Sequence, residues 1–390
     1  MRFTILFKIT FLLLFELANA QVLELPLEIS DRGHTFIKVS VNDSEELNFV
    51  FDTGATAEVI DTKVAEKIGV KSEYQQPVQG ASGEEFYDIA LNEKLKLDTI
   101  ELVSRAMVIK DLSNLNVLSD EKIDGIIGAT LLSKYITNID YSNKKIVFYK
   151  DDNDINLKDF TKIPFTFKTN IPIPLIKVGF TLENGESFAG NVLFDSGAGL
   201  SLSVNSPYNK KNKLSEKAEK KLLRKSSGLG AESYDERIRI KTLQLEGFSF
   251  TNLPIELSGA TEGVLASSDF MGILGAKIIQ RFNVVLDYNT KTMYLKPNKT
   301  YNNQFEFPLS GVQLKKVNDT IVVNHVSKNS EAYSKGLREN DIIISVNGDS
   351  SKRLNIYNSY FKNKGEEIKL NIKSVKGKEK TISFILKELI

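Results

Sequence analysis

Six short blocks of this 390-residue sequence occur twice, in the same order. The blocks are "LPLEI" (25–29) and "IPFTF" (163–167), "FIKVSV" (36–41) and "LIKVGF" (175–180), "FVFDTGA" (49–55) and "VLFDSGA" (192–198), "GEEFY" (83–87) and "GAESY" (230–234), "DGIIGATLLSKY" (124–135) and "FMGILGAKIIQRF" (270–282), and "IDYSNKKIVFYK" (139–150) and "LDYNTKTMYLK" (286–296). Recurrence of this kind indicates a duplicated unit. The protein is therefore predicted to contain two lobes of one design.

Both copies have the pattern of short β-strands separated by turns. Polar and apolar residues alternate in "FIKVSV", and β-branched and aromatic residues are frequent, which favours strands. Two helices are expected, at 62–69 and 213–225. The second is rich in lysine, and its Leu214, Ala218 and Leu222 recur every four residues, which favours a solvated helix over an anion-binding patch. The lobes are predicted to be mostly β.

Each copy contains one aspartate directly after an apolar strand, in "NFVFDTGATAEVI" (48–60) and "NVLFDSGAGLSLS" (191–203). The residues that follow can hold a carboxylate or the turn around it: Thr53 and Gly54 after Asp52, and Ser196 and Gly197 after Asp195. We call each of these turns, an aspartate followed by a hydroxyl residue and a glycine, a corner. A single corner is often only an Asx turn. Two copies in duplicated lobes favour a functional pair.

A pseudo-twofold axis between the lobes would bring Asp52 and Asp195 together. Two carboxylates at close range share one proton and titrate as a unit. The ionised member can then take a proton from a water, while the protonated member hydrogen-bonds a carbonyl. The predicted reaction is peptide hydrolysis by an activated water, without a covalent intermediate, a metal or another cofactor.

Composition excludes several other classes of protein. The sequence has no cysteine, which removes disulfides, thiolate zinc sites and cysteine proteases. It has two histidines, His34 and His325, and neither has a sequence setting typical of a catalytic triad. Lys and Arg number 51 and Asp and Glu 50, so no excess of positive charge indicates nucleic acid as a partner.

The two corners resemble those of retropepsin-type aspartic proteases, and their tandem arrangement in residues 22–298 resembles that of pepsin. The resemblance implies a pseudo-twofold acid-protease fold, with Asp52 and Asp195 as catalytic residues. It also implies that Ile126–Gly128 and Ile273–Gly275 cross beneath the aspartate loops. A β-hairpin flap covers the cleft in this family, and Tyr87 and Tyr234 are its candidate aromatic residues.

One position departs from the family pattern. The first lobe has Thr56 where the family often places a hydroxyl that supports the aspartate, but the second lobe has Gly199 there. We expect either an unsymmetrical dyad or a substitute role for Ser201. This difference supports an alternative function, in which the protein keeps the cleft and binds peptides without cleaving them.

The region after a polar linker (299–307) resembles a bacterial PDZ domain, an α+β fold that would span 308–390. "AYSKGLREND" (332–341) matches the turn from helix to strand, with Asn340 where the family usually has glycine, and Asn347-Gly348 forms a hairpin turn. "GVQL" (311–314) occupies the place of the carboxylate-binding loop. Such a domain accepts a peptide C-terminus or an added strand, although a purely structural cap is equally compatible with the sequence.

The first twenty residues have the pattern of an export signal. Arg2 and Lys8 precede or flank an apolar core, and "ANA" (18–20) predicts cleavage before Gln21. We therefore expect a periplasmic or extracellular protein. No later apolar run approaches the roughly 20 residues that a spanning helix needs, so no transmembrane segment is expected in the mature form.

The sequence is thus divided into a signal peptide (1–20), a first lobe (21–155), a second lobe (156–298), a linker (299–307) and a PDZ domain (308–390). The expected function is a secreted aspartic endopeptidase whose PDZ domain docks polypeptide substrates. We expect the PDZ domain to be dispensable for cleavage of short peptides, because both aspartates lie in the first 300 residues. A third possibility makes the PDZ domain the principal binding module, with the lobes as its scaffold.

Overall fold

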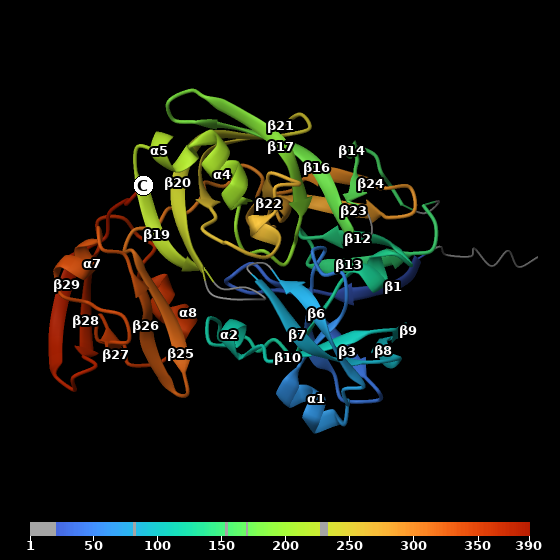
Figure 1. The fold of residues 1–390 in the computed structure, drawn as a ribbon, viewed down its shortest axis with the longest axis horizontal. Helices are drawn as coiled ribbons and strands as arrows, with labels where there is room; N and C mark the ends of the chain where they lie inside the picture. The colour runs from blue at the N-terminus through green and yellow to red at the C-terminus, as the bar shows by residue number, and fades with distance from the viewer. Residues whose placement is uncertain (1–20, 81–82, 153–154, 169–170, 227–232) are drawn as a thin grey trace, which may run out of the picture.

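A computed structural model describes residues 21–80, 83–152, 155–168, 171–226 and 233–390. The predicted signal peptide lies outside these residues. Figure 1 shows three bodies: the first lobe in blue to teal, the second lobe in green through yellow to light orange, and the C-terminal domain in deeper orange to red. The structure is mostly β with a PDZ domain at its C-terminus, as predicted.

The first lobe is built on a ten-stranded sheet of order β6-β7-β10-β5-β11-β4-β3-β8-β9, with β2 also paired to β3. Its elements are β1 (Gln21–Pro26), β2 (Glu28–Ile29), β3 (Thr35–Val41), β4 (Leu47–Phe51), β5 (Val59–Asp61), α1 (Thr62–Ile68), β6 (Tyr74–Gly80), β7 (Gly83–Ala90), β8 (Glu93–Leu97), β9 (Ile100–Ser104), β10 (Met107–Lys110), α2 (Ser113–Asn116), β11 (Gly125–Ile127), α3 (Ala129–Leu132), β12 (Ile136–Asp140) and β13 (Lys145–Tyr149).

The second lobe is built on an eight-stranded sheet of order β15-β16-β17-β22-β18-β21-β20-β19. Its elements are β14 (Thr161–Pro164), β15 (Thr166–Lys168), β16 (Ile171–Leu182), β17 (Ser187–Phe194), β18 (Leu202–Val204), α4 (Ser206–Asn212), α5 (Leu214–Lys217), β19 (Lys221–Ser226), β20 (Ser233–Leu245), β21 (Phe248–Leu257), η1 (Val264–Ala266), β22 (Gly272–Leu274), α6 (Ala276–Ile279), β23 (Phe282–Asp287) and β24 (Thr292–Pro297). The run β17-β22-β18-β21-β20-β19 repeats the run β4-β11-β5-β10-β7-β6 of the first lobe.

A six-stranded sheet of order β1-β13-β12-β23-β24-β14 joins the two lobes. At its centre β12 pairs antiparallel with β23, and Asn138 lies opposite Val285. These two residues are 285 − 138 = 147 positions apart, which is the spacing of the duplicated Gly128 and Gly275. This one pair therefore joins a residue to its own duplicate, and the pairs on either side of it, Thr137 with Leu286 and Ile139 with Val284, are related to each other by the duplication, as a pseudo-twofold axis requires.

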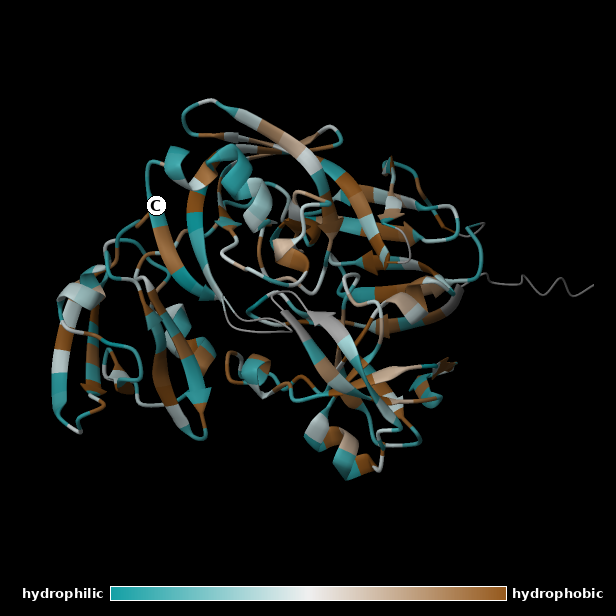
Figure 2. Ribbon diagram, in the orientation of Figure 1, coloured by the Kyte–Doolittle hydropathy of each residue, from teal (hydrophilic) through white to brown (hydrophobic). Residues whose placement is uncertain are grey.

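The apolar residues of both lobes meet in one large core. Its fully buried aromatic residues include Phe51, Phe148, Phe194 and Phe282, which come from both copies. Figure 2 shows the hydrophobic segments concentrated on the strands of the lobes. Burial of apolar surface at this junction stabilises the two lobes as one body.

The prediction of one helix over residues 213–225 was wrong. The structure has a single helical turn, α5, followed by strand β19 (Lys221–Ser226), which pairs with β20. Leu214 and Leu222 are both buried, but on different elements. Tertiary pairing with β20 overrides the local helical preference here.

The C-terminal domain is a five-stranded sheet of order β25-β26-β27-β28-β29 with two short helices. Its elements are β25 (Val312–Val317), β26 (Thr320–Val326), α7 (Glu331–Ser334), β27 (Ile342–Val346), α8 (Leu354–Ser359), β28 (Glu367–Lys373) and β29 (Glu379–Ile385). Asn340 has a left-handed backbone with φ of 64°, as its position in place of glycine predicted. Asn347 and Gly348 also have positive φ, and they form the predicted turn.

The segment between the second lobe and the PDZ domain packs against the lobe. The guanidinium of Arg281 donates hydrogen bonds to the carbonyl oxygens of Thr300, Tyr301 and Asn303 and lies 3.7 Å from the ring centroid of Phe305. The predicted linker is therefore attached to the lobe along much of its length. It restricts the positions that the PDZ domain can take.

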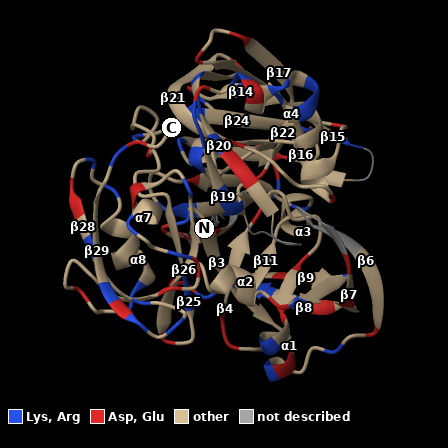
Figure 3. Ribbon diagram, turned by 60° about the vertical axis from the view of Figure 1, so that its left-hand side comes forward, with Lys and Arg blue, Asp and Glu red and all other residues tan. Residues whose placement is uncertain are grey.

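Figure 3 shows acidic and basic residues interspersed over all three bodies. Within the described residues, no group of three or more His, Asp or Glu side chains has an arrangement that could hold a metal ion. None of the helices in the described part of the protein is long and apolar enough to cross a membrane.

Candidate active site

Two equivalent strands deliver the two aspartates to the junction between the lobes. β4 ends at Phe51 and β17 at Phe194, and each is followed at once by its aspartate. A parallel neighbour supports each strand: the Asp52 N–H donates to the carbonyl of Ile127 on β11 (2.9 Å), and the Asp195 N–H to that of Leu274 on β22 (3.0 Å). The "IIG" and "ILG" segments therefore lie directly beneath the aspartate loops.

The glycine that ends each of these segments allows a very close approach. A Cβ atom on Gly128 would lie 2.0 Å from the carbonyl oxygen of Asp52, and one on Gly275 would lie 2.4 Å from that of Leu200. No side chain fits at such distances. Only glycine lets the supporting strand pass this close beneath the aspartate loop.

Thr53 and Ser196 bind the opposite lobe. The Thr53 hydroxyl donates to the carbonyl of Phe194 (2.7 Å) and accepts from the Ser196 N–H (2.9 Å). In return, the Ser196 hydroxyl donates to the carbonyl of Phe51 (3.2 Å) and accepts from the Thr53 N–H (3.1 Å). Sequence reasoning assigned these hydroxyls to their own turns; the structure uses them to connect the two turns.

This reciprocal arrangement brings the two carboxyl groups together. The Gly197 N–H donates to Oδ1 of Asp52 (3.2 Å) and to Oδ1 of Asp195 (2.9 Å). Asp52 also accepts from the Gly54 N–H (2.7 Å), and Asp195 from the Ala198 N–H (2.9 Å). Each carboxyl group also lies close against the loop of the other lobe: a Cβ on Gly54 would lie 2.6 Å from Cγ of Asp195, and one on Gly197 would lie 2.4 Å from Cγ of Asp52.

The surroundings of the pair favour one shared proton. Burial raises the pKa of both carboxyl groups, and for Asp195 the neighbouring charge of Asp52 raises it further. The hydrogen bonds from Gly54, Asp195 and Gly197 oppose this rise at Asp52. The pair therefore holds one proton in common and titrates as a unit.

Both aspartates line a cavity of about 440 Å³. Its walls next to the dyad are apolar and come from both lobes: Val50, Leu115, Leu118, Ile123 and Ile126 from the first, and Ile173, Leu193, Val264, Leu265 and Ile273 from the second. Such a site accepts apolar side chains on either side of a bond held at the dyad.

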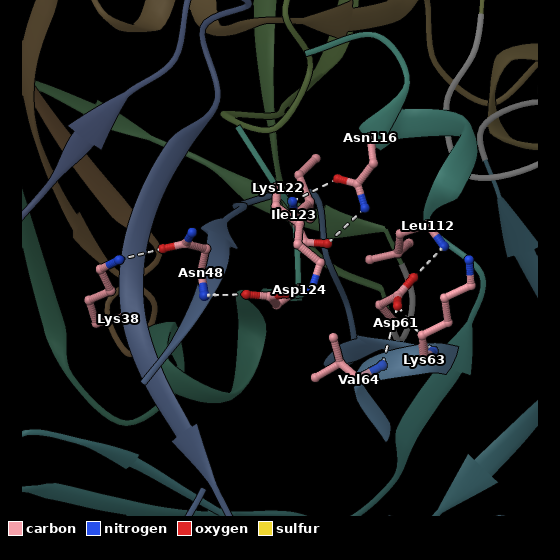
Figure 4. Close-up of polar contacts among 10 residues, drawn as sticks. All are labelled: Lys38, Asn48, Asp61, Lys63, Val64, Leu112, Asn116, Lys122, Ile123 and Asp124. Atoms are coloured by element: carbon pink, nitrogen blue, oxygen red, sulfur yellow. Dashed lines mark hydrogen bonds and ion pairs between the residues drawn. The ribbon is translucent and has the colours of Figure 1, made fainter. Parts of the chain in front are cut away.

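Polar residues of the first lobe, drawn in Figure 4, hold its cavity wall in place. Asp61 caps α1 through the Lys63 and Val64 N–H groups, and its second oxygen accepts from the Leu112 N–H (3.0 Å). Asn116 closes the loop by pairing with both backbone groups of Ile123.

Asp124 attaches the start of β11 to β4 by accepting from the Asn48 N–H (3.0 Å). It is followed directly by the segment that supports Asp52. Sequence reasoning missed Asp61, Asn116 and Asp124. The "D" of the repeated block "DGIIGATLLSKY" was the only available signal, and it marked Asp124 alone.

Asn205 holds the cavity wall of the second lobe in place. Its side-chain amide donates to the carbonyl oxygens of Val264, Ser267 and Phe270. This single residue fixes the loop 264–270, which includes Val264 and Leu265 of the cavity wall. It is fully buried, so its hydrogen bonds are protected from competition with water.

The position after each corner differs between lobes, as the sequence indicates. Thr56 is exposed, and the described interactions include no hydrogen bond from it to Asp52. A Cβ on Gly199 would lie 2.4 Å from the carbonyl oxygen of Arg32, so glycine is required for this first-lobe loop to cross the second corner. Ser201 is no substitute, because its buried hydroxyl has no hydrogen-bond partner among the described residues.

The expected flap hairpins are present, but their tips, 81–82 and 227–232, lie outside the described residues. Tyr87 donates to Glu85 (2.6 Å), and Lys110 bonds its hydroxyl. Tyr234 is 48% exposed, and its ring contacts His325 of the PDZ domain at 5.7 Å. Neither tyrosine lines the cavity that contains the dyad.

The second-lobe hairpin is attached to the PDZ domain through the outer edge of β19. The Gln313 side chain binds both the N–H and the carbonyl of Lys225 (2.9 and 3.0 Å). His325 and Ser327 contact the carbonyl oxygen of Leu223, and Asn329 that of Lys221. These side chains satisfy an edge that would otherwise be open.

The first lobe holds the other end of the PDZ domain. The Lys316 N–H on β25 donates to the carbonyl of Val117 (2.6 Å), and the Asp120 carboxylate accepts from the Leu354 and Asn355 N–H groups at the start of α8. Val312, Gln313 and Leu314 of β25 and Asn358 of α8 line the same cavity as the dyad. The PDZ domain is thus a third wall of this cavity.

Comparisons with known families agree with this arrangement. Residues 37–131 match the family model described as aspartyl protease, and residues 308–386 match the PDZ domain model. The protein has an aspartyl protease-like domain and a C-terminal PDZ domain. The first match lies within the first lobe. No curated protein matches the sequence.

Proposed function

We propose that this protein is an exported aspartic endopeptidase that cleaves extended polypeptides at the Asp52–Asp195 dyad. The observation that carries the proposal is that one N–H group, that of Gly197, donates to carboxyl oxygens of two aspartates from different lobes. The reciprocal bonds of Thr53 and Ser196 support it, because they fix the two carboxyl groups relative to each other. Preorganised geometry of this kind is what general acid–base catalysis requires.

In the proposed reaction, ionised Asp52 removes a proton from a water molecule held between the carboxyl groups. That water attacks the scissile carbonyl carbon, while the proton on Asp195 stabilises the developing charge on the carbonyl oxygen. Asp52 then gives its proton to the leaving nitrogen as the C–N bond breaks, which releases a carboxylic acid and an amine and restores the pair with one proton. The apolar walls of the cavity favour apolar side chains on both sides of the scissile bond.

The PDZ domain is proposed to hold the substrate beside the dyad. Its β25 and α8 residues line the dyad cavity, so an extended peptide bound along β25 continues towards the aspartates. This revises the expectation that short peptides would be cleaved equally well without the domain. Deletion of residues 308–390 removes one wall of the cavity and uncovers β19, and we expect short-peptide cleavage to fall with it.

The proposal is tested by digestion of a peptide library with residues 21–390, beside the variant Asp52→Asn. Cleavage by the wild type between apolar residues, with none by the variant, is the expected result. Peptide binding without hydrolysis at any acidic or neutral pH would instead identify a non-catalytic binding protein. Mass spectrometry of the exported protein tests the processing site, which is expected before Gln21.

A further inference from the structure

Two arginines from different lobes line the cavity between the dyad and the PDZ domain. Arg32 lies in the loop between β2 and β3 of the first lobe, and Arg224 lies on β19 of the second. The Arg32 backbone crosses the second corner at Gly199, so its side chain enters the cavity next to Asp195. Because position 199 is glycine, the loop that carries Arg32 can pass close to Asp195 and bring the arginine into the cavity.

Arg32 has few partners for its charge. One of its five N–H donors binds the neutral carbonyl oxygen of Leu118 (3.3 Å), and the described residues provide no carboxylate for it. Burial, with a smaller contribution from the charge of Arg224, lowers the pKa of Arg32 to about 10. A guanidinium enclosed in this way is costly unless an anion approaches it.

Arg224 shares its carboxylate partner with a second arginine. Oε1 of Glu256 accepts from Arg224 (2.9 Å) and from Arg237 (2.5 Å), so two guanidinium groups surround one negative charge. The second oxygen of Glu256 is buried without a partner among the described residues. One positive charge remains on this cluster before Arg32 is counted.

The other titratable groups of this wall do not remove the excess. Asp235 accepts from the Gly259 N–H (3.1 Å), and burial raises its pKa, which favours the neutral form. Burial, assisted by the charge of Arg32, lowers the pKa of His34 to about 4, so the imidazole is neutral. Apart from the dyad, three guanidinium groups (Arg32, Arg224 and Arg237) face the carboxylate of Glu256, or two carboxylates where Asp235 is ionised, and Lys225 also lines the cavity.

We propose that Arg32 and Arg224 form a subsite for a carboxylate of the polypeptide substrate, in the cavity that the dyad shares with β25 and α8 of the PDZ domain. This inference rests on the proposed function only for the identity of the ligand as a polypeptide. The carboxylate comes from an Asp or Glu side chain or from the C-terminus of the peptide. Planar guanidinium groups bind carboxylates through paired hydrogen bonds, and both chemical sources offer the same group.

Continuity of the cavity indicates that one polypeptide occupies it. Val312, Leu314 and Asn358 of the PDZ domain line it together with Arg32 and the dyad. A peptide added along the first residues of β25, before Lys316 whose N–H is bonded to Val117, places its backbone against a strand edge and one of its side chains against the arginine pair. The subsite thus selects a polypeptide with a carboxylate near the scissile bond.

Binding is measured with the Asp52→Asn variant, which removes cleavage from the experiment. Fluorescent peptides share two adjacent apolar residues and carry Glu at scanned positions; matched sets carry Gln or a C-terminal amide. One Glu position is expected to strengthen binding about 10- to 100-fold over Gln, as charge-assisted hydrogen bonds predict. If amidation rather than Glu→Gln weakens binding, the carboxylate is that of the peptide C-terminus.

Arginine variants in the same background decide whether the pair is responsible. Arg32→Gln should remove the preference, whereas Arg105→Gln, at an exposed position outside the cavity, should keep it. Arg32→Glu should reverse it in favour of Lys-containing peptides. Thermal unfolding identifies variants that do not fold, and Arg32→Lys, which retains the charge, then serves as the second probe.

Equal binding of Glu, Gln and amidated peptides by the folded Asp52→Asn protein would overturn the subsite. An unchanged preference in Arg32→Gln and Arg224→Gln would overturn it as well. Failure of the proposed function is a different result. In that case the otherwise unaltered protein hydrolyses no peptide, while the selective, arginine-dependent binding persists.

Discussion

The two lobes have the same strand order around the aspartates but differ in what lies above them. The first-lobe hairpin, β6–β7, has its Tyr87 bonded within its own lobe to Glu85 and Lys110. The second-lobe hairpin, β19–β20, is bound along one edge by side chains of the PDZ domain. The duplicated part thus holds the carboxyl groups, and the part that diverged forms a wall of the cavity.

The corners show the same division. Thr53 and Ser196 make equivalent bonds in opposite directions, so the connection between the lobes is symmetrical. Exposed Thr56 and its counterpart Gly199 are not equivalent, because the loop that carries Arg32 crosses the latter. Symmetry is kept where the geometry of two carboxyl groups depends on it and is lost where one side of the cavity acquires its own chemistry.

Loss of either carboxyl group gives the largest expected effect. Asp52→Asn and Asp195→Asn should each lower peptide hydrolysis by roughly 10³-fold or more, since the first removes the group that takes and returns the proton and the second removes the proton that stabilises the carbonyl oxygen. The turnover of a fluorogenic peptide measures this loss. Substantial activity in one variant alone would show that the lobes are chemically unequal.

Mixing the two inactive variants serves as the control for a site formed within one polypeptide. Both aspartates belong to the same molecule here, so the mixture should remain inactive and the wild-type specific activity should not change on dilution. Recovery of activity in the mixture would mean that lobes pair between molecules.

Thr53→Val tests whether the cross-lobe hydrogen bonds of Thr53 contribute more to stability than the exposed Thr56 does. The variant loses the hydrogen bond to Phe194 and leaves the buried Ser196 N–H without its acceptor. The expected cost is about 2–3 kcal/mol in the free energy of unfolding. Thr56→Val, at the exposed neighbour, is the matched control and should change it by less than about 0.5 kcal/mol. Equal effects in urea unfolding would contradict the assigned roles.

Gly199→Ala examines the crossing of the Arg32 loop. The added Cβ would meet the Arg32 carbonyl oxygen at 2.4 Å, so the loop must move. We expect a loss of about 1–2 kcal/mol of stability, typical of overpacking, together with weaker binding of acidic peptides. Gly179→Ala provides the control for glycine replacement, because its φ is not positive and the nearest atom to an added Cβ lies at 3.6 Å, an ordinary contact distance. Unchanged binding in Gly199→Ala would separate this glycine from the position of Arg32.

Much of the fold was predictable because the repeats carry it. The duplicated "FDTGA" and "FDSGA" corners with their "IIG" and "ILG" partners fix which strands meet, and the structure pairs β4 with β11 and β17 with β22 accordingly. Strand β19 was missed because its lysine-rich sequence suits a helix in isolation. Its pairing with β20 and its docking to the PDZ domain are long-range contacts that no local pattern records.

Some residues of the candidate site could not be predicted for the same reason, because long-range contacts bring them together. Residues adjacent in sequence to the aspartates were found, but Arg32 and Arg224 lie 20 and 29 positions from Asp52 and Asp195 (52 − 32 and 224 − 195). No periodicity links them to the corners. The cross-lobe bonds of Thr53 and Ser196 were equally invisible, since hydrogen bonding to a distant carbonyl leaves no mark on the residue type. Tertiary placement alone distinguishes these roles.

The smallest expected effect is on the pH dependence of folding stability. Its magnitude should differ between the Asp195→Asn and Asp52→Asn variants. Asp195 has a pKa raised well above its ordinary value near 3.8, by burial first and by the charge of Asp52 second. The folded state therefore holds this proton more tightly than the unfolded state does. Stability from this group is complete below the unfolded pKa and is lost as pH rises through the folded pKa.

Asp195→Asn removes that loss, so the variant should melt at a higher temperature than wild type at neutral pH. The difference should vanish below a pH of about 3.8, where both states of the wild type are protonated. Asp52→Asn should show the same sign with a smaller shift, because hydrogen bonds from Gly54, Asp195 and Gly197 counter the effect of burial. Thermal unfolding across roughly pH 3 to 8 measures both differences. A destabilised Asp195→Asn at neutral pH would mean that the bonds from Gly197 and Ala198 outweigh the desolvation of the carboxylate, and that the shared proton resides on the other lobe.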